Sequence, residues 1–196
     1  MKRSLVLLSA VFLLAACVDT TGISPNLSKP PKGNPAAVLT VSEYADLECP
    51  ACKRAHEILT QPLIQKYGSQ IRFEYHHFPL RSLHRFTMDL AEGAECAADQ
   101  GTFWEFVDIA FTRQDQLKAG IVSEWAKELG LDMDLFERCT DSHIKRDAVM
   151  AEYEEGVARG VQGTPTFYVG DKQVQATIEE LSNEIDLQLK TAGQRL

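Results

Sequence analysis

The chain has 196 residues, of which 44% are hydrophobic and 24% charged, with 12 glycines and 8 prolines. This composition is that of an ordinary globular protein, and it excludes collagen-like, low-complexity and multi-span membrane chains. The 20 Lys and Arg against 28 Asp and Glu give a net charge of −8. That balance argues against a nucleic-acid clamp, because phosphate binding needs a basic face.

The first 16 residues have the pattern of a secretory signal. Lys2 and Arg3 precede an apolar run that ends at residue 16 and is shorter than the roughly 20 residues of a membrane-spanning helix. The run closes with Leu14-Ala15-Ala16-Cys17, which resembles the lipobox of bacterial lipoproteins. We therefore expect residues 1–16 to be removed and Cys17 to be lipidated. An ordinary signal peptide with a chance cysteine at its end is the alternative.

Residues 17–37 are rich in proline and poor in side chains that could pack. They predict a lipidated N-terminus followed by a flexible tether. The domain proper is then expected over residues 38–190, with a short tail at 191–196. A domain of that size can bury one good core.

The start of the domain shows a strand, a helix and a second strand. Residues 38–44 alternate and carry β-branched side chains, residues 53–67 have helical spacing, and residues 70–78 alternate again. Pro62 is expected to kink or end the helix. If that helix is a crossover, the two strands are parallel.

The rest of the domain is first helical and then mixed. Between about residues 82 and 160 no strand pattern occurs, and five helical stretches are expected, at 84–99, 103–113, 122–129, 133–139 and 144–159. A hairpin follows at 167–169 and 173–175, and a capping box at Thr177 opens a final helix. The order β-α-β, helical block, β-β-α indicates one α/β sheet with the helices over one end.

Cys49-Pro50-Ala51-Cys52 lies where a strand ends and a helix begins. This spacing lets two sulfurs approach while only the first faces solvent, and the unpaired N–H groups of a helix start stabilise a thiolate. A structural disulfide and half of a zinc site are the alternatives. A structural zinc site needs four ligands, and no second C-x-x-C occurs in the sequence, so we expect no metal; His56 is expected to be exposed.

Together these motifs resemble the DsbA-like branch of the thioredoxin superfamily. The resemblance covers about residues 38–190 and is carried by the cysteine pair, by Gly163-Thr164-Pro165-Thr166, by Phe78-Pro79-Leu80 and by the run from Cys96 to Phe106. It implies a thioredoxin fold with a helical domain inserted between the second strand and the strand that follows a cis-proline.

The resemblance also implies roles for individual residues. Cys49 would be the nucleophile and Cys52 the resolving thiol. Pro165 would be the cis-proline facing them, and Thr164 would offer backbone hydrogen bonds to substrate; a trans proline opening an edge strand is the alternative. Glu43 matches an acidic residue beneath the active site that relays a proton for Cys52, whereas taken alone it reads as a solvated strand carboxylate.

Two departures from the family pattern concern the charge near Cys49. The position between the cysteines that often holds histidine is Ala51 here, and Glu48 places a negative charge directly before Cys49, which disfavours a thiolate. Lys53 and Arg54 act the other way. We expect the pKa of Cys49 to lie below about 8.5 but above the roughly 3.5 of DsbA.

The remaining cysteines, Cys96 and Cys139, both lie in the helical block. An even remainder in an exported protein suggests a bond, as in some DsbA-like proteins, and two separate buried thiols are the alternative. Among the other histidines, His76 and His77 are expected to be exposed at a strand end.

Two classes of function follow. The first is an envelope thiol–disulfide oxidoreductase that oxidises exported proteins, with the same pair able to serve a reductase or isomerase instead. The second is a thioredoxin-like metallochaperone that binds copper. For the oxidase we expect no cofactor, thiol-containing exported proteins as partners, a membrane quinone-linked reoxidising protein, and a monomer. The expected location is the periplasmic face of the cell envelope, with the outer membrane favoured because Val18 follows Cys17.

Overall fold

The computed structural model describes residues 18–193. A five-stranded sheet with the order β1-β3-β2-β4-β5 forms its centre. The strands are β1 Lys32–Gly33, β2 Leu39–Ala45, β3 Ile71–His77, β4 Thr166–Val169 and β5 Lys172–Val174. β2 and β3 are parallel, as expected from the intervening helix, and the other pairs are antiparallel.

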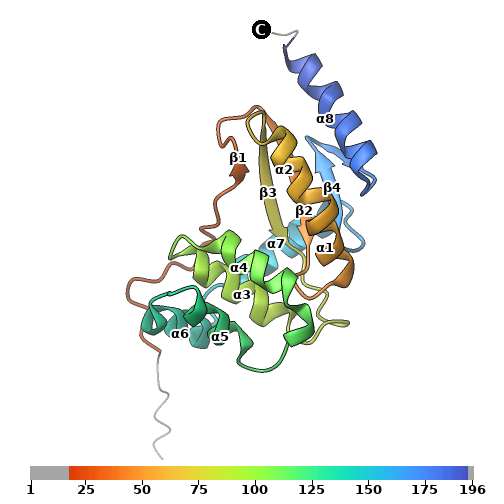
Figure 1. Ribbon diagram of the computed structural model, residues 1–196. Coiled ribbons are helices and arrows are strands. Elements are labelled where there is room, and N and C mark those ends of the chain that lie inside the picture. Colours follow the sequence, from red (N-terminus) through yellow and green to blue (C-terminus); the bar gives the residue numbers. More distant parts are fainter. Residues whose placement is uncertain (1–17, 194–196) are drawn as a thin grey trace, which may run out of the picture.

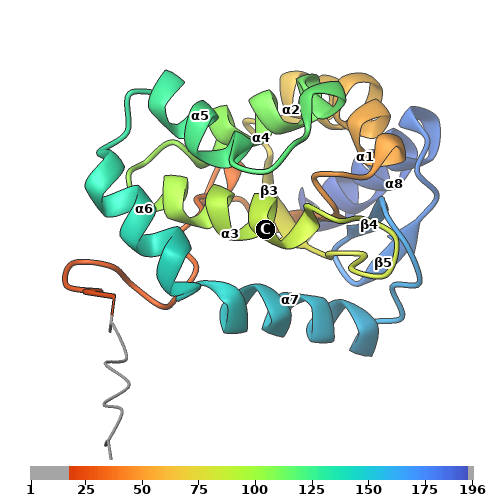
Figure 2. The same cartoon turned by 90° about the horizontal axis from the view of Figure 1, so that it is seen from below.

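The helices form layers on both faces of the sheet and a block at one end (Figures 1 and 2). They are α1 Pro50–Ala55, α2 Gln61–Tyr67, α3 Thr87–Ala98, α4 Phe103–Thr112, α5 Ile121–Glu128, α6 Met133–Ser142, α7 Arg146–Ala158 and α8 Ile178–Gly193. α1, α2 and α8 cover one face, and α7 lies along the other (Figure 2). Helices α3 to α6 form the block. The expected α/β fold with a helical insertion between β3 and β4 is confirmed.

One long helix joins β2 to β3 and changes its winding in the middle. Between α1 and α2, residues 56–60 form a π-helical turn in which the N–H of Gln61 bonds to the carbonyl of His56, five residues earlier. Pro62 has no N–H to donate and its ring crowds the preceding turn, so the wider turn accommodates it without ending the helix.

The two faces of the sheet are packed by different side chains because successive strand residues alternate. Val41 and Phe73 face α1 and α2 and join the main core with Leu63 and Ile185. Tyr44, on the opposite face, packs with Phe78, Val161 and Tyr168 beneath α7. The carboxyl ends of β2 and β3 reach the same edge, where the chain enters α1.

The prediction of a flexible tether before the domain is wrong for the described residues 18–37. The Trp104 indole donates to the carbonyl of Pro30 at 2.9 Å, and the Lys145 ammonium donates to the carbonyl of Asn26 at 2.7 Å. Lys29 forms ion pairs with Glu95 and Glu152, and β1 pairs with β3. Proline-rich composition does not show these contacts, because every partner lies far along the chain in the helical block and the sheet.

The C-terminal end also differs slightly from the expected domain limit of 190. Helix α8 continues to Gly193, and residues 194–196 lie outside the described part of the chain. One half of the expected capping box is present at its start, where the Thr177 hydroxyl accepts from the N–H of Glu180 at 3.2 Å. The N–H of Thr177, which a full capping box would pair with the Glu180 carboxylate, bonds to the carbonyl of Gln175 instead.

Gly156 lets α7 approach the sheet closely. A Cβ at this position would lie 2.8 Å from a ring atom of Phe78 and 2.9 Å from a ring atom of Tyr44. Because both rings are buried, we expect Gly156→Val to lower the free energy of unfolding by about 1–3 kcal/mol through overpacking. Urea denaturation measures the loss. Ala158→Val, which also introduces valine but at an exposed position of the same helix, is the matched control and should change stability by less than about 0.5 kcal/mol. Equal losses in the two variants would contradict the account.

Candidate active site

Cys49 lies at the turn from β2 into α1. It is the residue before the first helical residue, Pro50, and has extended backbone angles of φ −74° and ψ 121°. Proline suits that first position because its missing N–H would be unpaired there in any case. Cys52 follows one turn later, and both cysteines are free thiols, with Cys49 7% exposed and Cys52 fully buried. Cys49 is therefore the more accessible cysteine of the pair.

The surroundings of Cys49 favour its thiolate. A hydrogen bond from the Cys52 thiol lowers the pKa of Cys49 to about 5, with further help from Thr164 and from the N–H groups of Cys52 and Ala51, against the opposing effect of burial. Burial raises the pKa of Cys52 far above its usual value, and the hydrogen bond to Cys49 adds to the rise. The two cysteines thus hold one proton between them, on the buried sulfur.

The loop before β4 lies against the cysteine pair. The Thr164–Pro165 peptide bond is cis, and the carbonyl oxygen of Thr164 lies 3.7 Å from Sγ of Cys49. A surface groove of about 360 Å³ borders this loop and is lined by residues 160, 162–166 and 173. The structure therefore brings Cys49, Cys52, Thr164 and Pro165 together at the end of the sheet.

Glu43 is a buried carboxyl group beneath the long helix. It is 1% exposed, and its Oε2 accepts a hydrogen bond from the Thr60 hydroxyl at 2.8 Å. Burial raises the pKa of Glu43 to about 7, with the Thr60 bond opposing the rise. Tyr75 pairs with Glu43 across β2 and β3. Burial raises the pKa of Tyr75, and the charges of Cys52 and Glu43 add to that rise, so the three groups share one buried region. Glu43 is not the solvated strand carboxylate that the sequence alone would suggest.

Asp46 and Glu48 shape the turn, a role that sequence reasoning did not assign to them. Asp46 Oδ1 accepts from the N–H of Glu48 at 2.8 Å, and the carbonyl of Asp46 accepts from the N–H of Cys49 at 3.0 Å. An Asp that caps its own turn is a recognisable local signal. The Glu48 carboxylate accepts from the N–H of Phe86.

The prediction of exposed histidines is wrong for His56 and His77, which are 3% and 1% exposed. His56 Nε2 lies 2.9 Å from Asp108 Oδ1, and His77 Nε2 lies 2.9 Å from Glu95 Oε1. His76 is largely covered as well; burial disfavours its protonated form, but Glu152 and Glu74 overcome that effect and raise the pKa of His76 to about 9. No local signal identifies these partners, which are distant in sequence.

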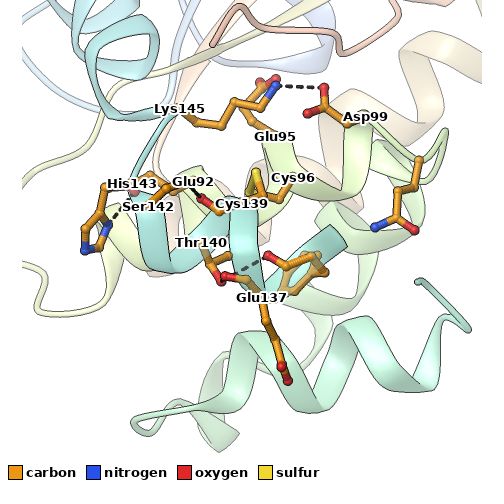
Figure 3. The surroundings of a disulfide bond; sticks show 12 residues. Glu92, Glu95, Cys96, Asp99, Glu137, Cys139, Thr140, Ser142, His143 and Lys145 are labelled. Atoms are coloured by element: carbon orange, nitrogen blue, oxygen red, sulfur yellow. Dashed lines mark hydrogen bonds and ion pairs between the residues drawn. A yellow bond between two sulfur atoms is a disulfide. The ribbon is translucent and has the colours of Figure 1, made fainter. Parts of the chain in front are cut away.

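Cys96 and Cys139 form a disulfide bond that joins α3 to α6, with the sulfurs 2.02 Å apart (Figure 3). Both cysteines are buried. Charged side chains surround the bond, and the Lys145–Asp99 ion pair at 2.7 Å lies beside it. The disulfide thus links two helices of the helical block, and it is separate from the Cys49–Cys52 pair.

The predicted lipidation residue, Cys17, and the signal segment before it lie outside the described residues. Within residues 18–193, no helix combines the length and the apolar character needed to cross a bilayer.

The chain is similar to known proteins over this whole domain. The family model described as Thioredoxin matches residues 27–187. Among curated proteins, the Na(+)/H(+) antiporter NhaA 1 of Salinispora arenicola is 37% identical over 156 residues, which cover 77% of this chain and 23% of the antiporter. The chain spans only about a quarter of the length of such relatives.

Two solved structures show the same arrangement. A thioredoxin-like oxidoreductase from Silicibacter pomeroyi has a TM-score of 0.71 and 26% identity, with 89% of this chain and 99% of that chain covered. α-DsbA1 of Wolbachia pipientis has a TM-score of 0.72 and 22% identity, with 88% and 95% covered.

Since the family model covers most of the chain, the chain belongs to the thioredoxin family. Its helical insertion between β3 and β4 gives it the fold seen in α-DsbA1 of Wolbachia pipientis.

The low pKa of Cys49 can be measured from the thiolate absorbance near 240 nm during a pH titration of the reduced protein. We expect a midpoint near 5. Cys52→Ala removes the hydrogen bond that lowers the pKa of Cys49 most, so the midpoint of this variant should be higher. Cys52→Ser keeps a hydrogen-bond donor, so its midpoint should rise less. A wild-type midpoint near the ordinary thiol value of about 8.5 would contradict this description.

The raised pKa of Glu43 predicts a specific pH dependence of stability. Between the ordinary glutamate value near 4.5 and the native value near 7, the native state binds more protons than the unfolded state. The free energy of unfolding therefore falls as the pH rises through this window, by about 3 kcal/mol in all.

Glu43→Gln has no such titration, so its stability relative to the wild type should increase by about 3 kcal/mol between pH 4.5 and pH 8. Denaturant unfolding of the oxidised proteins keeps Cys49 from contributing to the pH dependence. Glu57→Gln, at an exposed position in the π-helical turn that also contains Thr60, controls for the lost charge. Parallel pH profiles for Glu43→Gln and the wild type would rule out a buried, titrating Glu43.

Proposed function

We propose that this protein oxidises thiols of exported proteins to disulfides through Cys49 and Cys52. The observation that supports it best is the stabilised thiolate of Cys49, with its pKa near 5. Stabilising the thiolate stabilises the reduced enzyme, and a pair that prefers to be reduced takes electrons readily from other thiols. The value lies between those of DsbA, about 3.5, and thioredoxin, about 7.

The first step begins with the oxidised Cys49–Cys52 pair. A substrate thiolate attacks Sγ of Cys49, the Cys49–Cys52 bond breaks, and its electron pair goes to Sγ of Cys52. That buried sulfur needs a proton, since its pKa is far above the usual value. Glu43, with a pKa near 7, is partly protonated at neutral pH and is the proposed proton donor.

The second step releases the product. Another substrate thiolate attacks the substrate sulfur bonded to Cys49, a disulfide forms within the substrate, and Cys49 leaves as a thiolate. Two electrons have then moved from the substrate to the cysteine pair. Thr164, whose carbonyl faces Cys49, and cis Pro165 are proposed to align the substrate segment.

The setting of this chemistry is also a proposal. The Leu14-Ala15-Ala16-Cys17 tetrad supports a lipid anchor that faces the periplasm, with the outer membrane favoured by Val18 after Cys17. The anchored protein is proposed to be a monomer. A membrane quinone-linked protein would reoxidise the pair. Because Arg138 bonds to the carbonyls of Asp19 and Thr21, the domain would lie close to its anchor rather than at the end of a long tether.

The direction of electron flow is tested by the reduction potential of the pair in equilibrium with glutathione. A stabilised Cys49 thiolate predicts a value well above thioredoxin's, about −270 mV, and towards DsbA's, about −120 mV. The oxidised protein should then convert a reduced two-cysteine peptide to its disulfide, and Cys49→Ser should not. A potential at or below −270 mV would assign the pair to a reductase, the alternative with the same residues.

A further inference from the structure

The loop between β3 and α3, residues 79–86, is attached to the turn that presents Cys49. Asp46 Oδ2 accepts from the N–H of Leu80 at 2.8 Å and lies 2.7 Å from Nδ1 of His84. Glu48 Oε2 accepts from the N–H of Phe86 at 2.5 Å. The yellow-green loop lies beside the start of α1 in Figure 1. Two carboxylates within the three residues before Cys49 thus fix both ends of this loop.

The loop exposes one apolar and two cationic side chains. Leu83 is 75% exposed, and Arg81 and Arg85 are exposed on either side of it in the sequence. The arginines that form ion pairs within residues 18–193 are Arg72, Arg113, Arg138 and Arg146. Arg81 and Arg85 are therefore free to meet charges on another molecule.

These features match one kind of partner. The chain as a whole is acidic, with a net charge of −8, so two exposed arginines on a loop that is bonded to the cysteine turn form a local contrast that attracts carboxylates. Burial of the Leu83 side chain against an apolar residue lowers the free energy of binding. Because the loop backbone is already fixed, less conformational entropy is lost when a partner binds. The Asp46 carboxylate is buried and the Glu48 carboxylate is turned to the N–H of Phe86, so the charges that the loop itself exposes to solvent are those of Arg81 and Arg85.

We propose that the 79–86 loop selects thiol-bearing polypeptide segments in which carboxylates and an apolar residue flank the reacting cysteine. Arg81 and Arg85 contact the carboxylates, and Leu83 packs on the apolar residue. This inference rests on the proposed function, since it takes protein thiols to be the substrates, but it is independent of the direction of electron flow.

The test uses two synthetic peptides that differ only in charge. Each contains one leucine and one cysteine, flanked by glutamates in the first and by lysines in the second, and each cysteine carries a thionitrobenzoate disulfide. The Cys49 thiolate of the reduced protein attacks the peptide sulfur, the peptide–thionitrobenzoate bond breaks, and its electron pair leaves on the coloured thionitrobenzoate anion. Because the same bond breaks in both peptides, the ratio of the two rates reports recognition.

We expect the wild type to react about tenfold faster with the glutamate peptide at low salt, and this preference should shrink towards one at high salt. The double variant Arg81→Glu/Arg85→Glu should reverse the preference. Leu83→Ser should slow both peptides by about fivefold, without changing their ratio, as expected for the loss of apolar contact. A hydroxyethyl thionitrobenzoate disulfide, which has the same leaving group but no peptide, is measured in parallel and corrects every rate for changes in the reactivity of Cys49.

The matched control changes the net charge equally at other places. Lys66→Glu/Lys127→Glu alters two exposed lysines in α2 and α5 and should keep the preference for the glutamate peptide. Equal rates for the two peptides in the wild type would overturn the proposal, and so would a preference that survives the arginine reversal or disappears in the lysine control. If the preference holds but the oxidised protein fails to oxidise a two-cysteine peptide, the loop assignment stands and the proposed oxidase function falls.

Discussion

The active site depends on holding one negative charge on Cys49 Sγ where little water reaches it. Burial alone would suppress that charge, so several donors have to point at the sulfur at once. The Cys52 thiol and the N–H groups at the start of α1 supply these donors. Cys52 keeps its own proton, because its deeper burial raises its pKa. This arrangement requires the strand, the helix and the Thr164–Pro165 loop to meet at one point.

The rigidity of that point comes from polar contacts as well as from the core. Asp46 and Glu48 tie the cysteine turn to the 79–86 loop, which leads directly into α3. Further from the turn, Lys29 contacts Glu95 of α3 and Glu152 of α7, and these carboxylates also lie against His77 and His76 of β3. The N-terminal arm at residues 18–37, the insertion and the sheet therefore share one buried ionic cluster. Breaking one partner of such a pair leaves a buried charge uncompensated, which makes the cluster a strong constraint on how these parts fit together.

Much of the fold could be predicted because its signals are local. The alternation before Cys49, the helical spacing of the block and the hairpin after Pro165 correspond to β2, to α3–α7 and to β4–β5, with differences of a few residues at their ends. The Cys49–Cys52 spacing likewise predicted two thiols at a strand-to-helix turn, where the structure has them. The arm at residues 18–37 was mistaken for a tether because its prolines say nothing of Trp104 and Lys145, which bind its carbonyls.

The sequence by itself therefore determined the order of the elements, the cysteine pair at a strand-to-helix turn, and the chemistry that two such sulfurs can perform. These depend on residues that are neighbours in the chain. Only the tertiary structure decided the burial of Glu43, the enclosure of the histidines and the contacts of Asp46 and Glu48 with the 79–86 loop. Burial and ion pairing depend on residues brought together from distant parts of the chain, and the electrostatics of the site follow from them.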